Sequence, residues 1–189
     1  MLNDKDIRNK LIDKLNKKNS GHEFRIINEL GICDGDARVD IALANGRLCG
    51  YEIKSDMDTL ERLPGQIVAY NKTFDKITIV IGTKFENKIK NYVPEFWGIE
   101  VAYINKFGNV SIKRLRAAKV NKNIESKALL ELLWKEEIKE LLLRYGNKGL
   151  YNKNKRKLRD MAIETIPLKD IKDFARETIK FRKGWRVDL

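Results

Sequence analysis

The segment from Arg38 to Lys54 constrains the fold more than any other part of the 189-residue chain. Two short runs alternate between apolar and polar side chains, and Asn45-Gly46 between them is the strongest short-range signal for a β-hairpin. A two-residue loop would place the apolar residues of the two strands on opposite faces of the sheet. Because a slip of one residue moves every side chain to the other face, we expect a three-residue loop over 45–47 or a bulge near Gly50.

The corrected register places the apolar side chains of both strands on one face, with 39 opposite 53, 41 opposite 51 and 43 opposite 49. On the other face it places Asp40 opposite Glu52, and Lys54 lies beside them because residues two apart in a strand point the same way. The rest of that face is small: Ala42, Ala44 and Gly50. We therefore expect two carboxylates and an ammonium to converge on an open surface.

This grouping suits a metal site. Two adjacent carboxylates repel each other, and one takes up a proton unless a cation joins them. Mg²⁺ or Mn²⁺ would fit, because such cations accept carboxylate oxygens, and a metal there would polarise a phosphate and activate water. Lys54 would then stabilise the attacking water or the developing negative charge. The alternative is a solvated strand face with a weak Glu52–Lys54 ion pair, which is the commoner meaning of Glu-x-Lys alone.

The order Asp40, hairpin, Glu52-Ile53-Lys54 resembles the signature of the PD-(D/E)XK nuclease superfamily, although Val39 stands where the family name has Pro. Downstream, Gln66-Ile67-Val68-Ala69-Tyr70 resembles the Gln-x-x-x-Tyr motif of RecB-type members. The linking residues 55–63 resemble a family of mostly uncharacterised bacterial and prophage members. The signature covers about residues 20–82, and the weaker resemblance extends to the C-terminus. It implies a restriction-endonuclease-like fold and metal-dependent hydrolysis of DNA rather than RNA.

The resemblance also implies roles for individual residues. Those with an expected catalytic role are Asp40, Glu52 and Lys54. The expected metal ligands are Asp40, Glu52, the carbonyl of Ile53 and an upstream acid, for which Glu29 is the candidate and Asp13 the runner-up. The expected substrate contacts are Gln66, Tyr70, Arg62 and Arg38. Two alternatives stay open: Tyr70 as a core aromatic, and Glu29 as a charge at a strand end.

Charge points to a polyanionic partner. The chain carries a net charge of +12, and residues 1–118 hold 20 basic and 16 acidic side chains, whereas residues 119–189 hold 19 and 11. Such a surface favours nucleic acid, although abundant lysine can also serve only to solvate a surface. No apolar run is long enough to span a membrane, so we expect a cytoplasmic protein without a membrane partner. One histidine and two cysteines without zinc spacing disfavour histidine catalysis and zinc binding.

Residues 1–118 predict a nuclease-like α/β core, a mixed β-sheet flanked by helices. We expect helices over 4–18, 64–74 and 84–93, and strands over 22–30, 76–82, 98–104 and 110–115 besides the hairpin. The β-branched run 76–82 indicates a buried parallel strand.

Residues 119–189 predict a basic α-helical extension, with helices over 126–145, from 153 and from Pro167 to about 182. Trp134 and Trp185 are expected to pack the extension on the core. The tail 180–186 interleaves aromatic and basic residues and suits contact with a nucleic-acid strand.

Two functions from different classes follow. The first is a metal-dependent nuclease. The second is a non-catalytic nucleic-acid-binding or complex-assembly subunit that keeps the fold, and a structural Lys54–Glu52 pair in an empty site is a third reading. A homodimer or a protein partner stays open in each case.

Overall fold

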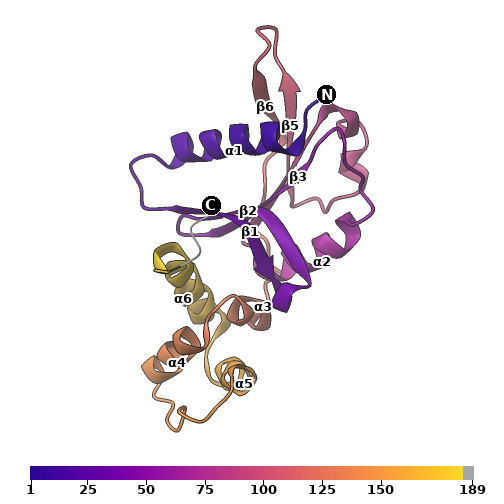
Figure 1. Ribbon diagram of the computed structural model, residues 1–189. Helices are drawn as coiled ribbons and strands as arrows, with labels where there is room; N and C mark the ends of the chain where they lie inside the picture. Colours follow the sequence, from indigo (N-terminus) through magenta and orange to yellow (C-terminus); the bar gives the residue numbers. More distant parts are fainter. Residues whose placement is uncertain (185–189) are drawn as a thin grey trace.

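The computed structural model describes residues 1–184 and contains one six-stranded mixed β-sheet with the spatial order β1-β2-β3-β4-β5-β6 (Figure 1). Strands β1, β2 and β3 are antiparallel neighbours, β3, β4 and β5 run parallel, and β6 returns antiparallel to β5. The predicted α/β class is therefore confirmed. The strands are β1 (Arg25–Ile32), β2 (Ala37–Ala44), β3 (Leu48–Lys54), β4 (Lys76–Ile81), β5 (Gly98–Ile104) and β6 (Val110–Arg116).

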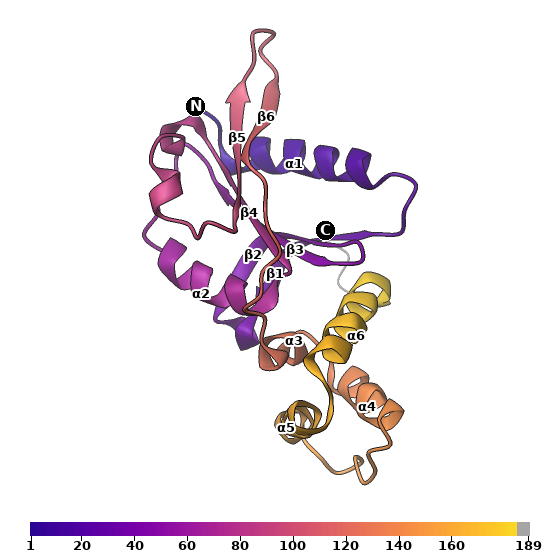
Figure 2. The ribbon, with the colours of Figure 1, turned by 180° about the vertical axis from the view of Figure 1, so that it is seen from behind.

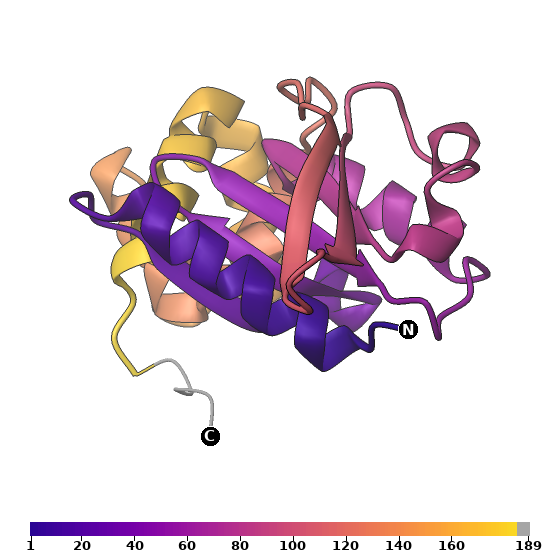
Figure 3. The same ribbon diagram turned by 90° about the horizontal axis from the view of Figure 1, so that it is seen from above.

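Helices cover both faces of the sheet. Helix α1 (Asp4–Asn19) crosses one face, where its apolar side chains at four-residue spacing meet the inner residues of β2 and β3 (Figure 3). The Asn3 side chain caps this helix by accepting the Asp6 N–H at 2.9 Å. The opposite face carries α2 (Leu63–Thr73), α3 (Ser126–Glu131) and α6 (Leu168–Phe181), and α4 (Lys135–Arg144) and α5 (Lys155–Thr165) pack against α3 and α6 beyond them (Figure 2). No helix in the described part of the chain is long and apolar enough to cross a membrane.

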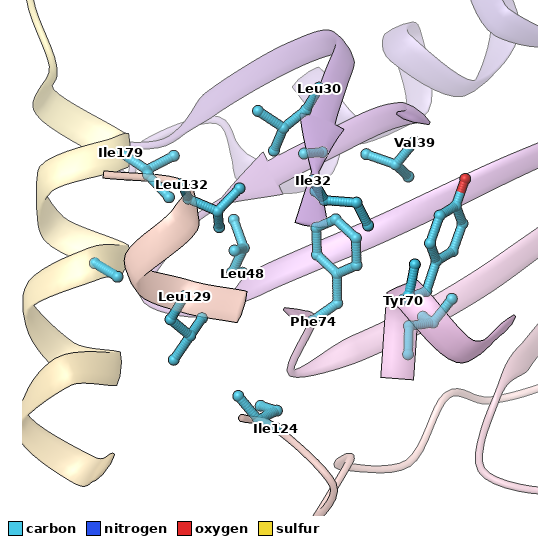
Figure 4. Packing of buried hydrophobic residues seen from close by; sticks show 14 of the residues in the cluster. Leu30, Ile32, Val39, Leu48, Tyr70, Phe74, Ile124, Leu129, Leu132 and Ile179 are labelled. Atoms are coloured by element: carbon cyan, nitrogen blue, oxygen red, sulfur yellow. The ribbon is translucent and has the colours of Figure 1, made fainter. Parts of the chain in front are cut away.

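The apolar cluster between the sheet and the helices α2 and α3 to α6 is continuous across residue 118, where the sequence suggests a domain boundary. Leu129, Leu132 and Ile179 of the extension lie in the same cluster as Leu48 and Phe74 of the sheet layer (Figure 4). A buried ion pair adds to this contact, since Arg176 on α6 donates to both oxygens of Asp75 just before β4, at 2.6 and 2.9 Å. The helical extension and the sheet thus share one core.

The hairpin has the predicted register. Ile41 pairs with Tyr51 and Leu43 with Cys49, and the Asn45 N–H donates to the Arg47 carbonyl across a three-residue loop. Gly46 at the centre has φ +91°, a conformation that glycine adopts at little cost. The predicted register is therefore confirmed for residues 41–51.

The prediction that Val39 pairs with Ile53 on the same face is wrong. The β2–β3 ladder ends at Ile41 and Tyr51. Ile41 packs in the apolar cluster under α1, whereas Val39 packs in the cluster on the other face of the sheet. In both β1 and β2, the alternation of side chains between the two faces of the sheet reverses at the same level, at Glu29 in β1 and at Asp40 in β2. Glu29 has φ 52° there. This reversal frees the Asp40 side chain to reach β3.

The expectation of an open face beside Asp40 is also wrong over most of its length. Ala42 and Ala44 belong to the cluster under the helices, and a Cβ at Gly50 would lie 2.8 Å from the Phe74 ring. The small residues therefore allow close packing of Phe74. On this face of the sheet, the end of β3 that carries Glu52 and Lys54 meets a cavity.

Two predicted helices differ in the structure. Residues 84–93 form short 3-10 turns, Thr83–Phe85 and Ile89–Asn91, in which N–H groups bond to carbonyls three residues back. The predicted helix 126–145 is broken at 132–134, where Glu137 accepts the Trp134 N–H at 2.6 Å and starts α4.

The predicted packing role of Trp134 is wrong. Its side chain is 46% exposed, and the Arg182 guanidinium lies 4.5 Å from its ring centroid. Trp185 and the end of the tail 180–186 lie outside the described residues.

Candidate active site

A cavity of about 980 Å³ opens at the C-terminal end of β3. Its wall includes Glu52, Ile53 and Lys54 from β3 and Asp40 from β2, together with side chains from α1, β1 and α2. All the residues for which the sequence predicts a catalytic role line this one cavity. The others with a predicted role that line it are Glu29, Arg38, Arg62 and Gln66.

Asp40 bridges two strands and a helix. One carboxylate oxygen accepts the Ile53 N–H at 2.7 Å, in place of the backbone pairing that the ladder has lost. The other accepts Arg8 Nη2 at 3.0 Å, and the Asp40 carbonyl accepts Arg8 Nη1 at 2.8 Å. Burial and the neighbouring Glu52 raise the pKa of Asp40 to about 7, against the opposite effects of Ile53 and Arg8. The positive charge near the carboxyls of Asp40 and Glu52 is therefore too small to keep Asp40 ionised at its ordinary pKa.

Glu52 is deeply buried, with 3% of its side chain exposed, and both of its oxygens have donors. One oxygen accepts Lys54 Nζ at 2.7 Å and Gln66 Nε2 at 2.6 Å, and the other accepts the Tyr70 hydroxyl. Lys54 also donates to Gln66 Oε1 at 3.0 Å. A buried ion pair persists only when further hydrogen bonds satisfy it, and Gln66 and Tyr70 supply them.

Tyr70 is a core residue. Its side chain is fully buried, and its ring stacks on Trp97 with the centroids 5.9 Å apart. The Phe74 ring lies edge-on to it at 5.8 Å (Figure 4). Its hydroxyl also donates to the Arg38 carbonyl at 2.9 Å, and burial and Glu52 raise its pKa, so it remains a donor. The assignment of Tyr70 to substrate contact is therefore corrected to the core alternative, because neither face of the ring is free for stacking. The residue positions Glu52.

The two arginines with predicted substrate contacts, Arg38 and Arg62, line the cavity, and Glu29 links Arg38 to Arg8 of α1. Glu29 accepts Arg38 Nε at 2.8 Å and Arg8 Nη2 at 2.9 Å. Arg62, at the start of α2, is exposed. Asp13, the runner-up for the upstream acid, is exposed and does not line the cavity.

Sequence reasoning missed Arg8 and Asp4. Both lie on α1, four residues apart, and the Arg8 Nε donates to Asp4 at 3.0 Å. Arg8 therefore contacts three carboxylates, those of Asp4, Glu29 and Asp40. The i,i+4 spacing of Asp4 and Arg8 was visible in the sequence, but not the position of α1 over the hairpin.

The chain matches the sequence profile described as Bacteriophage P4 protein cII over residues 1–186. It belongs to the bacteriophage P4 protein cII family. The Protein cII of Enterobacteria phage P4 is 32% identical over 182 residues, which span 96% of this chain and 68% of that protein. No solved structure matches the chain. The expected phage association is confirmed at the level of this family, whose name states no activity, and the nuclease resemblance stays a prediction.

The donor set of this cII-family chain is compatible with Mg²⁺, although no three Asp, Glu, His or Cys side chains within residues 1–184 already form a metal site. Mg²⁺ needs only one or two carboxylates and keeps several waters, and Asp40 and Glu52 face the same cavity. The Ile53 N–H points to Asp40, and the carbonyl of a strand residue lies on the same edge as its N–H. Burial and Glu52 raise the pKa of Asp40, so a cation bound beside it would stabilise the ionised form of this carboxyl.

Proposed function

We propose that this protein is a metal-dependent nuclease of the PD-(D/E)XK type that hydrolyses phosphodiester bonds of DNA. The observation that carries the proposal is the meeting of Asp40, Glu52 and Lys54 on one cavity wall, with Gln66 bonded to two of them. The preference for DNA over RNA comes from the family resemblance alone. The high basic charge supports a nucleic-acid substrate.

Each residue has a defined part in such a site. Asp40, Glu52 and the Ile53 carbonyl would hold a divalent cation, which when bound would polarise the phosphate and activate water. Lys54 would place its ammonium beside the attacking water or the developing negative charge. Gln66 holds the Lys54 ammonium and the Glu52 carboxylate in their relative positions, and Tyr70 fixes the other Glu52 oxygen. Arg38 and Arg62 at the cavity would contact phosphates.

A second candidate is a non-catalytic nucleic-acid-binding subunit that keeps this fold. The observation that favours it is Arg8, whose guanidinium already forms ion pairs with the carboxylates of Asp40 and Glu29. In that case the cluster is an internal salt bridge that fastens α1 to the sheet. DNA binding would then be independent of metal and of Lys54.

The test is cleavage of supercoiled, linear and single-stranded DNA in Mg²⁺, in Mn²⁺ and in EDTA. We expect cleavage in the metal buffers only, lost in Lys54→Ala and in Asp40→Asn, and retained in Lys90→Ala, which removes an exposed lysine outside the cavity. Because Lys54 is buried, circular dichroism and a thermal melt must show that each variant is folded. The Asp40→Asn change keeps the side-chain shape and is the safer of the two.

The outcomes separate the two candidates. Metal-dependent cleavage that Lys54→Ala and Asp40→Asn leave intact would reject this site as the catalytic one. DNA binding without cleavage in either metal, equal in wild type and Lys54→Ala, would support the binding subunit.

A further inference from the structure

A second cavity, of about 300 Å³, opens on the side of the sheet that α1 covers. It lies between the end of α1, the 45–47 loop, the starts of β3 and β4, and residues of β5 and β6. None of its lining residues lines the cavity of Asp40 and Glu52. The two cavities are therefore separate sites.

Basic side chains dominate the lining of this second cavity. Four of them have no carboxylate within ion-pair distance in the described part of the chain: Lys18, Arg47, Lys76 and Arg114. The one acidic residue of the lining, Glu100, pairs with Lys14 through one carboxylate oxygen at 2.7 Å, and within residues 1–184 its other oxygen is buried without a hydrogen-bond partner. The wall thus has an excess of positive charge that the protein itself does not neutralise.

Arg116 adds a fixed cation to this wall. Its Nε and Nη2 donate to the carbonyls of Trp97 and Pro94, both at 2.7 Å, so neutral groups hold the guanidinium in place. Beside the cavity, burial and the negative charge of Asp75 raise the pKa of Cys49 to about 11, and the positive charges of Lys76, Arg47 and Lys18 act against that rise. These three cations belong to three different elements, β4, the hairpin loop and α1, and all line the cavity.

Like charges gathered in this way repel one another, and an anion placed among them relieves the repulsion. The cations come from α1, the hairpin loop, β4 and β6, so they surround the mouth at several points. The chain leaves the cavity through Ala117 and Ala118 and continues with Lys119 and Lys122, both exposed. A ligand with several successive phosphates matches this spread better than a single phosphate does.

We propose that this cationic cavity, lined by Lys18, Arg47, Lys76, Arg114 and Arg116, binds the phosphate backbone of a nucleic-acid strand. The site lies apart from the carboxylates and holds the strand whether or not the protein cleaves it. It goes beyond the proposed nuclease function, because neither Lys54 nor a metal takes part in it.

The test is equilibrium binding of a labelled oligonucleotide, single-stranded and duplex, in EDTA over a range of salt concentrations. The variant is Arg47→Gln/Arg114→Gln, which removes two exposed cations with no internal ion pair. The charge-matched control is Lys90→Gln/Lys106→Gln, two exposed lysines outside the cavity. Because each phosphate contact releases counterions, we expect the slope of log Kd against log salt to fall by about 1.4 to 1.8 in the cavity variant and by less than about half that in the control.

Equal slopes and affinities in the cavity variant and the control would overturn the proposal. A parallel titration uses inorganic phosphate and a mononucleotide. If these bind and are lost in the cavity variant while oligonucleotide binding is unchanged, the cavity serves a small phosphate compound and the proposal is also overturned. The EDTA buffer keeps both results independent of any cleavage activity.

Discussion

Arg8 on α1 and Asp40 on β2 are joined by two hydrogen bonds, one to the Asp40 carbonyl at 2.8 Å and one to its carboxylate at 3.0 Å. The same guanidinium contacts Glu29 at 2.9 Å. A cation of the protein thus lies against the carboxylates that the proposed metal would use. Arg8 links α1 to the sheet, and it would compete with a bound metal for the carboxylates of Asp40 and Glu29.

The first prediction concerns this competition. Arg8→Met should lower the free energy of unfolding without metal by about 1–3 kcal/mol, because Asp40 is left with less compensation. The same change should increase the affinity for Mn²⁺, since the carboxylates lose their internal cation. Urea denaturation and isothermal titration calorimetry measure the two effects.

The control for this prediction is Arg62→Met, which removes a cation from the same cavity that forms no ion pair with these carboxylates. Equal Mn²⁺ affinity in Arg8→Met and Arg62→Met would contradict the competition.

The second prediction follows from the pKa of Asp40, which is raised from 3.8 to about 7. Between these values the folded state binds more protons at this group than the unfolded state does, so stability falls as pH rises from about 4 to 7. Asp40→Asn has no proton to lose and should lack this part of the pH dependence. Urea denaturation of both proteins at pH 4.5 and 7.5 checks it.

Between pH 4.5 and 7.5, the free energy of unfolding should fall more in the wild type than in Asp40→Asn, by at most about 4 kcal/mol. Titrating groups far from Asp40 are common to both proteins and cancel, whereas the coupling of Asp40 to Glu52 is part of the measured difference. A larger loss in the variant would reverse the sign and show that Asp40 is ionised at acid pH.

The third prediction concerns the hydroxyl of Tyr70. Tyr70→Phe keeps the ring packing but removes the donor to Glu52 and to the Arg38 carbonyl. We expect a loss of about 1–3 kcal/mol in the free energy of unfolding, because a buried carboxylate oxygen loses its partner. Tyr151→Phe, at a tyrosine that is 88% exposed, is the control and should change stability by less than about 0.5 kcal/mol. A loss no larger than that of the control would mean that another donor replaces the hydroxyl.

The fourth prediction concerns Gly82, which follows β4. A Cβ at this position would lie 2.2 Å from Oδ1 of Asp56. The carboxylate of Asp56 is buried, and it is held in place because it accepts the N–H groups of Leu2 and Lys84 at 3.0 and 3.1 Å. Gly82→Ala should therefore destabilise the protein by more than about 2 kcal/mol and loosen the start of α1. Hydrogen exchange of the α1 amides and a thermal melt measure both effects.

Gly65 within α2 is the matched control for Gly82, because a Cβ there meets no atom within 4 Å and its φ is not positive. Gly65→Ala should stabilise the helix by about 0.5–1 kcal/mol. A neutral Gly82→Ala would show that Asp56 moves without cost and does not anchor the N-terminus.

Much of the local structure could be predicted because it depends on neighbours in the chain. The alternation of apolar residues around Asn45-Gly46 requires a three-residue loop or a bulge near Gly50, and the structure has the loop. The β-branched run 76–82 predicts the buried parallel strand. The same alternation failed at Val39, because both strands reverse at the rung of Glu29 and Asp40, where Arg8 from α1 pairs with both carboxylates. At the break over 132–134, the Leu132 carbonyl also accepts Arg182 at 2.9 Å, a contact between residues 50 positions apart.

The mixed α/β class, the hairpin register over 41–51 and the placement of Lys54 beside Glu52 follow from strand and helix periodicities, which position side chains from local information. Asp40 joins this site although the register predicted for its end of the hairpin is wrong, and Gln66 was predicted there through the resemblance to the nuclease superfamily. Tertiary contacts fix which groups complete the site and which are buried. Arg8 meets Asp40 across 32 positions, and Tyr70 enters the core because Trp97 and Phe74 enclose it. The cationic cavity likewise joins Lys18 to Arg116. Such contacts depend on how helices cross the sheet, and no periodicity in the chain encodes that geometry.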